Sequence, residues 1–229
     1  GVPLHRLMGI DPRTMPPTSF TIGMDTPEIV EEKVREATDF EVLKVKMGSA
    51  DDRRVLETVR GVVDCPIRVD ANEGWALEDA VARLEWLQEM GVELVEQPLP
   101  ADRHADMCEL KKKSPLPLFA DESVARAADI PRLAEAFDGI NIKLMKCGGL
   151  GEALRMIHVA RAHGMKIMLG CMVESSLAVT AAAHIAPLVD FADLDGNLLI
   201  TNDPFIGAEV REGKLVRPSE PGRGVRERS

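Results

Sequence analysis

Charged residues recur at regular distances along the 229-residue chain, each near the end of a short apolar run. Successive members lie 24, 26, 25 and 22 residues apart, and the last step is 50 or 52 residues to a pair of aspartates. The set is Lys46, Asp70, Glu96, Asp121, Lys143, Asp193 and Asp195. Because lysines can transfer protons and clustered carboxylates can hold a cation, this set predicts acid–base chemistry beside a metal ion.

The three carboxylates Asp70, Glu96 and Asp121 end three consecutive apolar runs. If they converge, they repel one another and resist ionisation, which a divalent cation relieves. Oxygen donors alone favour Mg²⁺, with Mn²⁺ as a second ion, whereas the alternative without a metal is a network with Arg68. Zinc is not expected, because the five histidines lack the spacing of zinc ligands. They are His5, His104, His158, His163 and His184.

The segment EVLKVKMG, residues 41–48, is predicted to be a strand with two lysines on one side. Lys44 and Lys46 lie two residues apart, and side chains alternate across a strand. We expect Lys46 and Lys143 to face each other, so that one removes a proton from a carbon beside a carboxylate and the other returns it on the opposite face. The removing lysine must be neutral, and the charge of Lys44 would lower the pKa of Lys46. Lys146 is expected to lie off this inward face or beyond the end of the strand.

Two aspartates in the segment DLD, Asp193 and Asp195, are predicted to share one face of the last strand, opposite Glu96. If a metal holds a substrate carboxylate, these aspartates would bind a positive group at the far end of the substrate. The alternative is a structural role, in which Asp195 stabilises the turn before Gly196.

Short apolar runs alternate with amphipathic stretches and so position these residues. Eight strands are predicted, at residues 19–24, 41–48, 66–72, 92–98, 117–123, 139–145, 166–172 and 190–195. Helices are predicted between them, most clearly at 26–38, 77–91 and 151–164. This alternation predicts a parallel sheet, and eight units predict an α/β fold that closes into a TIM-like barrel. After the eighth strand, which lacks an obvious helix, the chain is predicted to form a hairpin and a polar tail.

The composition narrows the classes of function. With 45% hydrophobic residues the chain can bury one barrel-sized core, and a net charge of −10 with a pI near 5.1 argues against a nucleic-acid partner. We expect no membrane partner, because no apolar run is long enough to span a bilayer and the first residues do not resemble a signal peptide. Scattered cysteines predict reduced thiols and a cytoplasmic location. They are Cys65, Cys108, Cys147 and Cys171.

The motifs around these residues, taken together, resemble those of the enolase superfamily. KVKMG, RVDANEGW, VEQPL, ADES, NIKLMKCGG and DLDG follow the order of its muconate-lactonizing subgroup, most closely the dipeptide epimerases of the L-Ala-D/L-Glu type. The resemblance extends over residues 1–225 and implies a (β/α)₇β barrel that epimerises a dipeptide by 1,1-proton transfer through an enediolate. The implied roles are Mg²⁺ binding by Asp70, Glu96 and Asp121, acid–base catalysis by Lys46 and Lys143, binding of the substrate α-ammonium group by Asp193 and Asp195, and supporting contacts from Lys44 and the loop around Met172 and Glu174.

The resemblance also implies a capping domain in front of the barrel. Residues 1–18 would be the linker from that domain, which is missing from this chain, residues 19–197 the catalytic barrel, and residues 198–229 a tail packed toward the cap. Barrels of this kind are often homo-oligomers. Related muconate cycloisomerases and o-succinylbenzoate synthases are alternative functions, but DLD argues against them because their substrates carry no ammonium group. The alternative outside enzymes is an inactive barrel that binds carboxylates.

Overall fold

Eight parallel strands form one sheet in the computed structural model, which describes residues 1–49, 51–211 and 213–228. In sheet order they are β1 (Ser19–Ile22), β2 (Val42–Lys46), β3 (Ile67–Asp70), β4 (Val92–Glu96), β5 (Leu118–Ala120), β6 (Gly139–Lys143), β7 (Lys166–Gly170) and β8 (Phe191–Asp193). All eight predicted strands are confirmed, and each ends two or three residues earlier than predicted. The charged residues therefore stand at the last strand position or within two residues of it, where the chain leaves the sheet.

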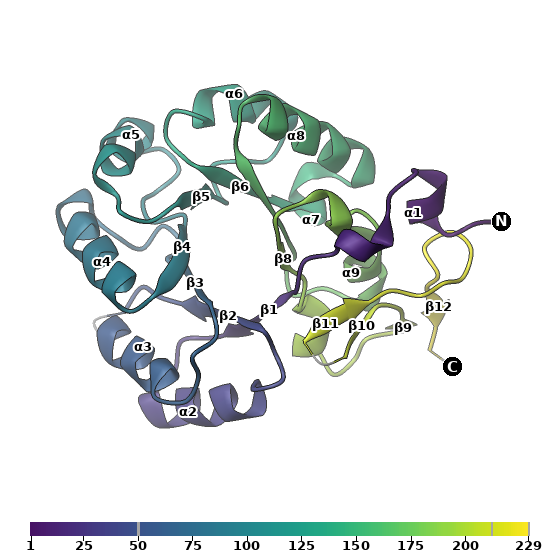
Figure 1. Cartoon of the computed structure of the whole chain (residues 1–229), viewed down its shortest axis with the longest axis horizontal. Helices are drawn as coiled ribbons and strands as arrows, with labels where there is room; N and C mark the ends of the chain where they lie inside the picture. Colours follow the sequence, from purple (N-terminus) through teal and green to yellow (C-terminus); the bar gives the residue numbers. More distant parts are fainter. Residues whose placement is uncertain (50, 212, 229) are drawn as a thin grey trace.

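The sheet closes into a barrel between β1 and β8. Thr18 forms a parallel bridge with Ala192, and its hydroxyl accepts a hydrogen bond of 2.8 Å from the backbone N–H of Leu194. Figure 1 shows the strands as a ring surrounded by helices. The parallel α/β barrel that the sequence predicts is thus confirmed.

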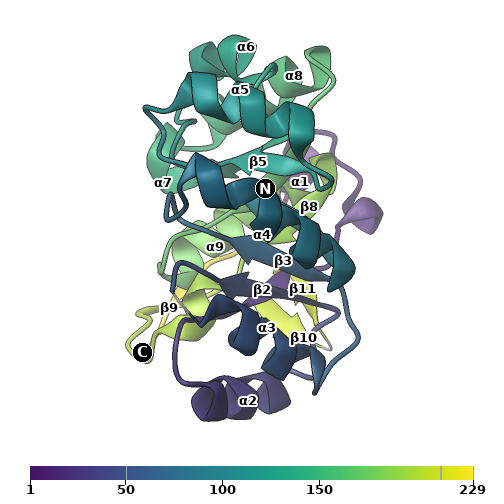
Figure 2. The same ribbon diagram turned by 90° about the vertical axis from the view of Figure 1, so that its left-hand side faces the viewer.

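Helices cover the outside of the barrel. The longer ones are α2 (Pro27–Glu36), α3 (Asp52–Arg60), α4 (Leu77–Glu89), α5 (His104–Lys113), α8 (Leu150–Ala162) and α9 (Ser176–Ala183), and the one-turn helices are α1 (Leu4–Leu7), α6 (Ile130–Leu133) and α7 (Leu144–Cys147). Figure 2 shows α2, α3, α4 and α5 stacked along the outer surface. The three clearest predicted helices are confirmed as α2, α4 and α8. Gly91 and Gly164, both at φ +71°, take the left-handed conformation that ends α4 and α8.

The barrel interior has an apolar floor beneath the charged residues. It consists of Leu94, Phe119, Met168 and Phe191. Side chains alternate along a strand, and Leu94 lies two residues before Glu96, so the floor and the charged layer occupy the same inward face. Gly139 makes room for the floor, because a Cβ atom there would lie 2.3 Å from the ring of Phe119. The outward neighbours of the charged residues, such as Val69 and Val95, pack against the helices in the main apolar core.

The chain after β8 forms the predicted hairpin and one further strand pair. The antiparallel pairs are β10 (Glu209–Arg211) with β11 (Lys214–Val216), and β9 (Phe205–Ile206) with β12 (Arg226–Glu227). The β9–β12 pair was not predicted, because two-residue strands leave no periodic pattern in a sequence.

The first residues of the chain pack beside this C-terminal segment. Pro3 forms a parallel bridge with Gly222, and the imidazole of His5 stacks on that of His184 with ring centroids 5.4 Å apart. Figure 1 shows both chain ends on this side of the barrel. The predicted domain limits after residues 18 and 197 stay predictions.

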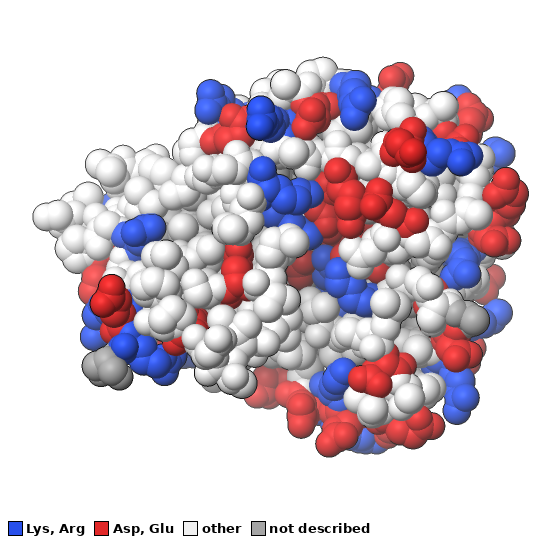
Figure 3. All heavy atoms as spheres, turned by 180° about the vertical axis from the view of Figure 1, so that it is seen from behind, with Lys and Arg blue, Asp and Glu red and all other residues white. Residues whose placement is uncertain are grey.

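The surface carries charges of both signs. On the face drawn in Figure 3, lysines and arginines lie side by side with aspartates and glutamates. Within the described ranges, every helix is too short or too polar to cross a membrane. The four cysteines are free thiols, and Cys147 is buried while the other three are half-buried.

Candidate active site

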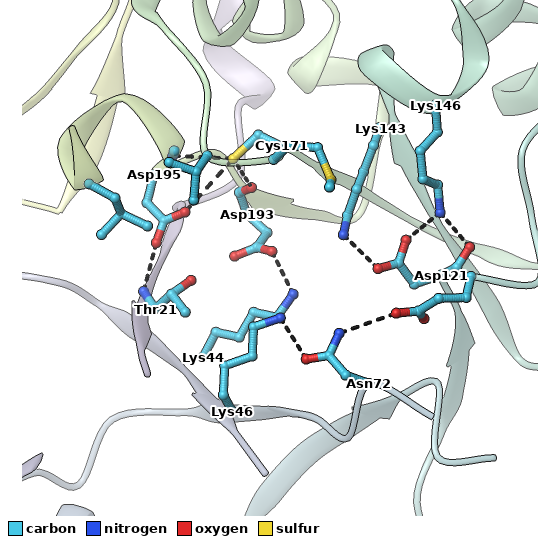
Figure 4. A pocket seen from close by; sticks show the side chains of 15 residues that line it. Thr21, Lys44, Lys46, Asn72, Asp121, Lys143, Lys146, Cys171, Asp193 and Asp195 are labelled. Carbon is cyan, nitrogen blue, oxygen red and sulfur yellow. Dashed lines mark hydrogen bonds and ion pairs between the residues drawn. The ribbon is translucent and has the colours of Figure 1, made fainter. Parts of the chain in front are cut away.

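A cavity of about 300 Å³ opens where the strands that carry the charged residues end. Figure 4 shows side chains from β2, β6 and β8 pointing into it. Six of the residues that the sequence singled out line it: Lys44, Lys46, Asp121, Lys143, Asp193 and Asp195. The other two, Asp70 and Glu96, lie beneath its surface and are almost wholly buried. The structure therefore brings the predicted residues together in one place.

Three carboxylates, those of Asp70, Glu96 and Asp121, converge at the bottom of the cavity. Each offers an oxygen within 4.8 Å of the other two, and all three residues are at most 3% exposed. The sheet register accounts for part of this arrangement, because Asp70 lies directly beside Glu96 in the β3–β4 pair. Three buried carboxylates with oxygen donors alone fit the ligand preference of Mg²⁺ or Mn²⁺.

Burial and neighbouring charge set the protonation of these carboxylates. Burial raises the pKa of Glu96 to about 8, and the charges of the other two carboxylates add to the shift. Burial acts in the same direction on Asp121, but the ammonium groups of Lys143 and Lys146 outweigh it and lower the pKa of that carboxyl. The ammonium group of Lys44 opposes the shift at Glu96 but does not outweigh burial, so a further cation beside Glu96 would favour its ionised form.

Lys44 is the most enclosed of the lysines, with 3% of its surface exposed. Its Nζ atom lies 2.8 Å from Glu96 and from Asp193 and 3.0 Å from Asp70. Burial alone would lower the pKa of Lys44, but these three carboxylates raise it well above the usual value, so the side chain is a cation. Lys44 therefore neutralises the carboxylates and links them to β8, and its predicted influence on Lys46 stays a prediction.

Lys46 and Lys143 approach the trio from different sides. Lys46 donates to Asp70 at 2.7 Å, and Lys143 donates to Asp121 at 2.5 Å. Burial lowers the pKa of Lys143, but the charges of Asp121 and Glu96 outweigh burial and raise it. The ion pair with Asp121 must therefore weaken before Lys143 can act as a neutral base.

Lys146 lies beyond the end of β6, which is one of the two positions predicted for it, yet it belongs to the site. Its Nζ atom lies in the cavity and contacts both the carboxylate and the backbone carbonyl of Asp121. This contact forms because α7 begins directly after Lys143, at Leu144. Because residues three positions apart lie on the same side of a helical turn, Lys146 faces the same side as Lys143.

Two asparagines in the site were missed. Asn72 accepts a hydrogen bond from Lys46 at 2.8 Å, and Asn141 donates to Glu96 at 2.8 Å. Asn141 lies two residues before Lys143 on β6, so the period of two along a strand could have found it, whereas Asn72 lies in the loop after β3, where no strand period applies. Both fix a charged group in place, because each bonds to a residue of the predicted set.

The two aspartates of DLD have different surroundings. Asp193 accepts hydrogen bonds on both oxygens, from Ser19 at 2.5 Å and from Lys44 at 2.8 Å. Asp195 accepts one from the backbone N–H of Thr21 at 2.7 Å, and its other oxygen lies 3.8 Å from the thiol of Cys171, a weak donor. Burial, and then the charge of Asp193, raises the pKa of Asp195 to about 6. Asp193 is thus paired with a lysine, whereas the two donors to Asp195 are uncharged.

Arg68 does not form the predicted alternative network. It lies two residues before Asp70, one layer deeper in the barrel, where it donates to Glu93 at 2.9 Å and to the carbonyl of Ala192 at 2.9 Å. Its guanidinium group also lies 4.8 Å from the ring of Phe191. The positive charges beside the trio come instead from lysines of β2, β6 and α7.

Residues 28–228 match the family model described as enolase C-terminal domain-like. This range contains the carboxylate trio, the two aspartates of the DLD segment and the four lysines of the site, which are Lys44, Lys46, Lys143 and Lys146. The chain belongs to the enolase C-terminal domain-like family. The resemblance to the enolase superfamily that the motifs predict is thereby confirmed.

Two curated relatives of this enolase-like chain are epimerases. The L-Ala-D/L-Glu epimerase of Bacteroides thetaiotaomicron is 48% identical over 227 residues, which are 98% of this chain and 59% of the relative. The L-Ala-D/L-amino acid epimerase of Pedosphaera parvula is 44% identical over 235 residues, which cover 100% of this chain and 68% of the relative. The chain therefore spans about three fifths to two thirds of the length of these proteins.

A solved structure shows the same barrel. The dipeptide epimerase of Cytophaga hutchinsonii, in a complex with Mg and the dipeptide D-Ala-L-Val, matches with a TM-score of 0.93 and 29% identity. The match covers 100% of this chain and 66% of that protein. About two thirds of that epimerase thus has the fold of the present chain.

Proposed function

We propose that the chain carries the catalytic barrel of a Mg²⁺-dependent dipeptide epimerase. The observation that carries the proposal is the position of Lys46 and Lys143 on different sides of three buried carboxylates. The names of the relatives support the reaction, and the Mg and dipeptide in the Cytophaga structure support the ion and the substrate class. Because the chain spans 59% of the Bacteroides relative, the activity of the whole protein is part of this proposal.

The residues that would hold Mg²⁺ are Asp70, Glu96 and Asp121. When bound there, the ion supplies positive charge that stabilises the negative charge developing on a substrate carboxylate. Mn²⁺ is the alternative ion, since it accepts the same oxygen donors. Asn141 keeps one oxygen of Glu96 oriented through its hydrogen bond of 2.8 Å, so the trio is held from below as well as from the sides.

Lys46 and Lys143 would move the proton. One lysine, in its neutral form, takes the proton from the α-carbon next to the substrate carboxylate, so that a C–H bond breaks and an N–H bond forms. The other lysine, as an ammonium group, gives a proton to the same carbon from the opposite face. The configuration of the carbon inverts, and one lysine ends protonated and the other neutral. For the reverse reaction the two lysines exchange roles.

Asp195, supported by Asp193, would bind the α-ammonium group of the dipeptide. Both are nearly buried on the β8 side of the cavity, and Asp195 receives only a backbone N–H and a weak thiol donor, so a cationic group would be its strongest partner. This favours a substrate with a positive group over the substrates of muconate cycloisomerases and o-succinylbenzoate synthases. A cytoplasmic location is also part of the proposal, and the four free thiols support a reducing compartment.

The proposal is tested by exchange of the α-proton for deuterium. The chain is incubated with Mg²⁺ and a library of dipeptides in D₂O, L-Ala-L-Glu included, and the mass of each dipeptide is followed. We expect a gain of one mass unit that depends on Mg²⁺, disappears with a chelator and is lost in the Asp121→Asn variant. Binding of Mg²⁺ without exchange in any dipeptide would instead favour the inactive barrel that binds carboxylates.

A further inference from the structure

A second cluster of metal-binding side chains lies on the outside of the barrel. His104 and Cys108 are one turn apart on α5, and Glu135 follows the end of α6 by two residues. Figures 1 and 2 both show α5 and α6 as neighbours on the barrel wall. The prediction that the histidines lack ligand spacing is wrong for His104, because residues four apart on a helix share one face.

Two distances in this cluster are close to those between ligand atoms around one small cation. The Nε2 atom of His104 lies 3.7 Å from the sulfur of Cys108 and 3.5 Å from a carboxylate oxygen of Glu135. In a tetrahedral zinc site with Zn–N near 2.0 Å and Zn–S near 2.3 Å, ligand atoms are separated by about 3.3–3.6 Å. One ligand atom from each residue lies within 4.8 Å of the others.

One nitrogen of His104 faces both other groups of the cluster. With a proton on Nε2 it can donate to Glu135, and the sulfur of Cys108 is then at most a weak acceptor. A cation would instead accept the lone pairs of the nitrogen, the thiolate and the carboxylate together, and so would use all three groups.

We propose that His104, Cys108 and Glu135 bind a Zn²⁺ ion, with water in the fourth position. A nitrogen, a sulfur and an oxygen form a donor set that suits zinc, whereas Mg²⁺ prefers oxygen donors alone. The side chains of His104 and Glu135 are 31% and 73% exposed, so an ion can enter from solution. The ion would tie α5 to the segment after α6 and thereby stabilise this part of the barrel wall. This site is independent of the function proposed above.

Co²⁺ reports directly on the thiolate ligand. Titration of the full chain with Co²⁺, in excess Mg²⁺ and under reducing conditions, is expected to produce an ultraviolet thiolate-to-cobalt band that Zn²⁺ abolishes. The band should disappear in Cys108→Ser and persist in the control Cys65→Ser, whose thiol is also half-buried. A band that survives in Cys108→Ser, or that is lost in Cys65→Ser, overturns the proposal.

Zinc affinity gives the second test. Glu135→Gln changes an exposed side chain and does not threaten folding, and the matched control is Glu109→Gln, an exposed glutamate on α5. Loss of a residue that only hydrogen-bonds to a metal ligand weakens metal binding by about 10–100-fold. Because His104 would be a ligand itself, we expect His104→Ala to weaken zinc binding by at least about 100-fold. Glu135→Gln should weaken it by about 10-fold or more and Glu109→Gln should not. The second site would be refuted if His104→Ala and Glu135→Gln both kept the original zinc affinity while Asp121→Asn abolished zinc binding. That result would mean that zinc binds only in the barrel mouth.

Discussion

On β4, β5 and β8 the barrel interior has two layers that lie two residues apart and have opposite properties. The lower layer, the floor of Leu94, Phe119, Met168 and Phe191, buries apolar surface and so stabilises the fold. The upper layer buries carboxylates and lysines that are stabilised mainly by one another. The pKa values of about 8 for Glu96 and about 6 for Asp195 indicate that the folded chain resists ionisation there. Residues two positions apart on one strand thus contribute to stability in the lower layer and to reactivity in the upper layer.

The largest effect is expected from a change in the upper layer and concerns activity. Lys143→Ala removes one of the two proton-transfer groups, so epimerisation should fall by about 10²–10⁴-fold, the usual worth of a general acid or base. Chiral chromatography of the dipeptide measures the rate. Asp121 keeps its contact with Lys146, so the variant is expected to remain folded.

The matched control for that variant is Lys166→Ala. Lys166 is the first residue of β7, at the other end of the barrel, and its side chain is 62% exposed. Its removal should leave the rate unchanged. A normal rate in Lys143→Ala would remove Lys143 from the reaction and make the upper layer a structural ion-pair network.

Met168→Ala acts on the lower layer and should change stability. The side chain is fully buried, and its loss leaves a cavity that costs about 2–5 kcal/mol of unfolding free energy. Urea unfolding followed by circular dichroism measures the loss, with Met145→Ala as the control because Met145 is 66% exposed. A loss below about 1 kcal/mol, no larger than an average substitution causes, would argue against a packed floor.

A smaller effect, on substrate preference, is expected from Asp195→Asn. Loss of a charge-assisted hydrogen bond worth about 1.5–3 kcal/mol should lower kcat/KM for a dipeptide by about 10–100-fold. The N-acetylated dipeptide, which has no ammonium group, should lose little. If kcat/KM fell equally for both substrates, the role of Asp195 would instead be to stabilise the turn before Gly196.

The smallest effect is the pH dependence of stability in the same variant. The pKa of Asp195 is raised to about 6 from 3.8, chiefly by burial, so above about pH 6 the fold holds a carboxylate that the unfolded chain would solvate better. Asp195→Asn should therefore raise Tm at pH 7, and the gain should shrink as the pH falls from about 6 toward 4. Thermal unfolding over this range measures it. If Asp195→Asn raised Tm more at low pH than at neutral pH, the raised pKa of Asp195 would be contradicted.

The sequence was sufficient for the strands and for the charged layer, because both depend on short-range periodicity. Alternation along each strand placed Lys46 and Lys143 on inward faces, and the regular spacing of Asp70, Glu96 and Asp121 placed the carboxylates at one barrel end. The strand ends were predicted two or three residues too late. After β2 and β6 an apolar residue, Met47 or Leu144, continues the run past the point where the chain leaves the sheet.

Contacts between distant elements could not be predicted. The contact of Lys146 with Asp121 was not foreseen because nothing in the sequence marks the immediate start of α7 after β6. The bond of Lys44 to Asp193, 149 residues away in the chain, depends on how far the barrel closes. Glu135 joins His104 and Cys108 only because α5 and α6 are neighbours in space, which a spacing rule along one helix does not capture.

The central claim, that two lysines act on opposite faces of one carbon, is tested most directly by deuterium exchange in single-lysine variants. Lys46→Ala and Lys143→Ala are each incubated with both epimers of the active dipeptide in D₂O. Each variant should exchange the α-proton of one epimer only, without inverting it, and the two variants should select opposite epimers, because the remaining lysine reaches one face. Exchange of the same epimer by both variants, or inversion by either, would contradict the two-lysine account.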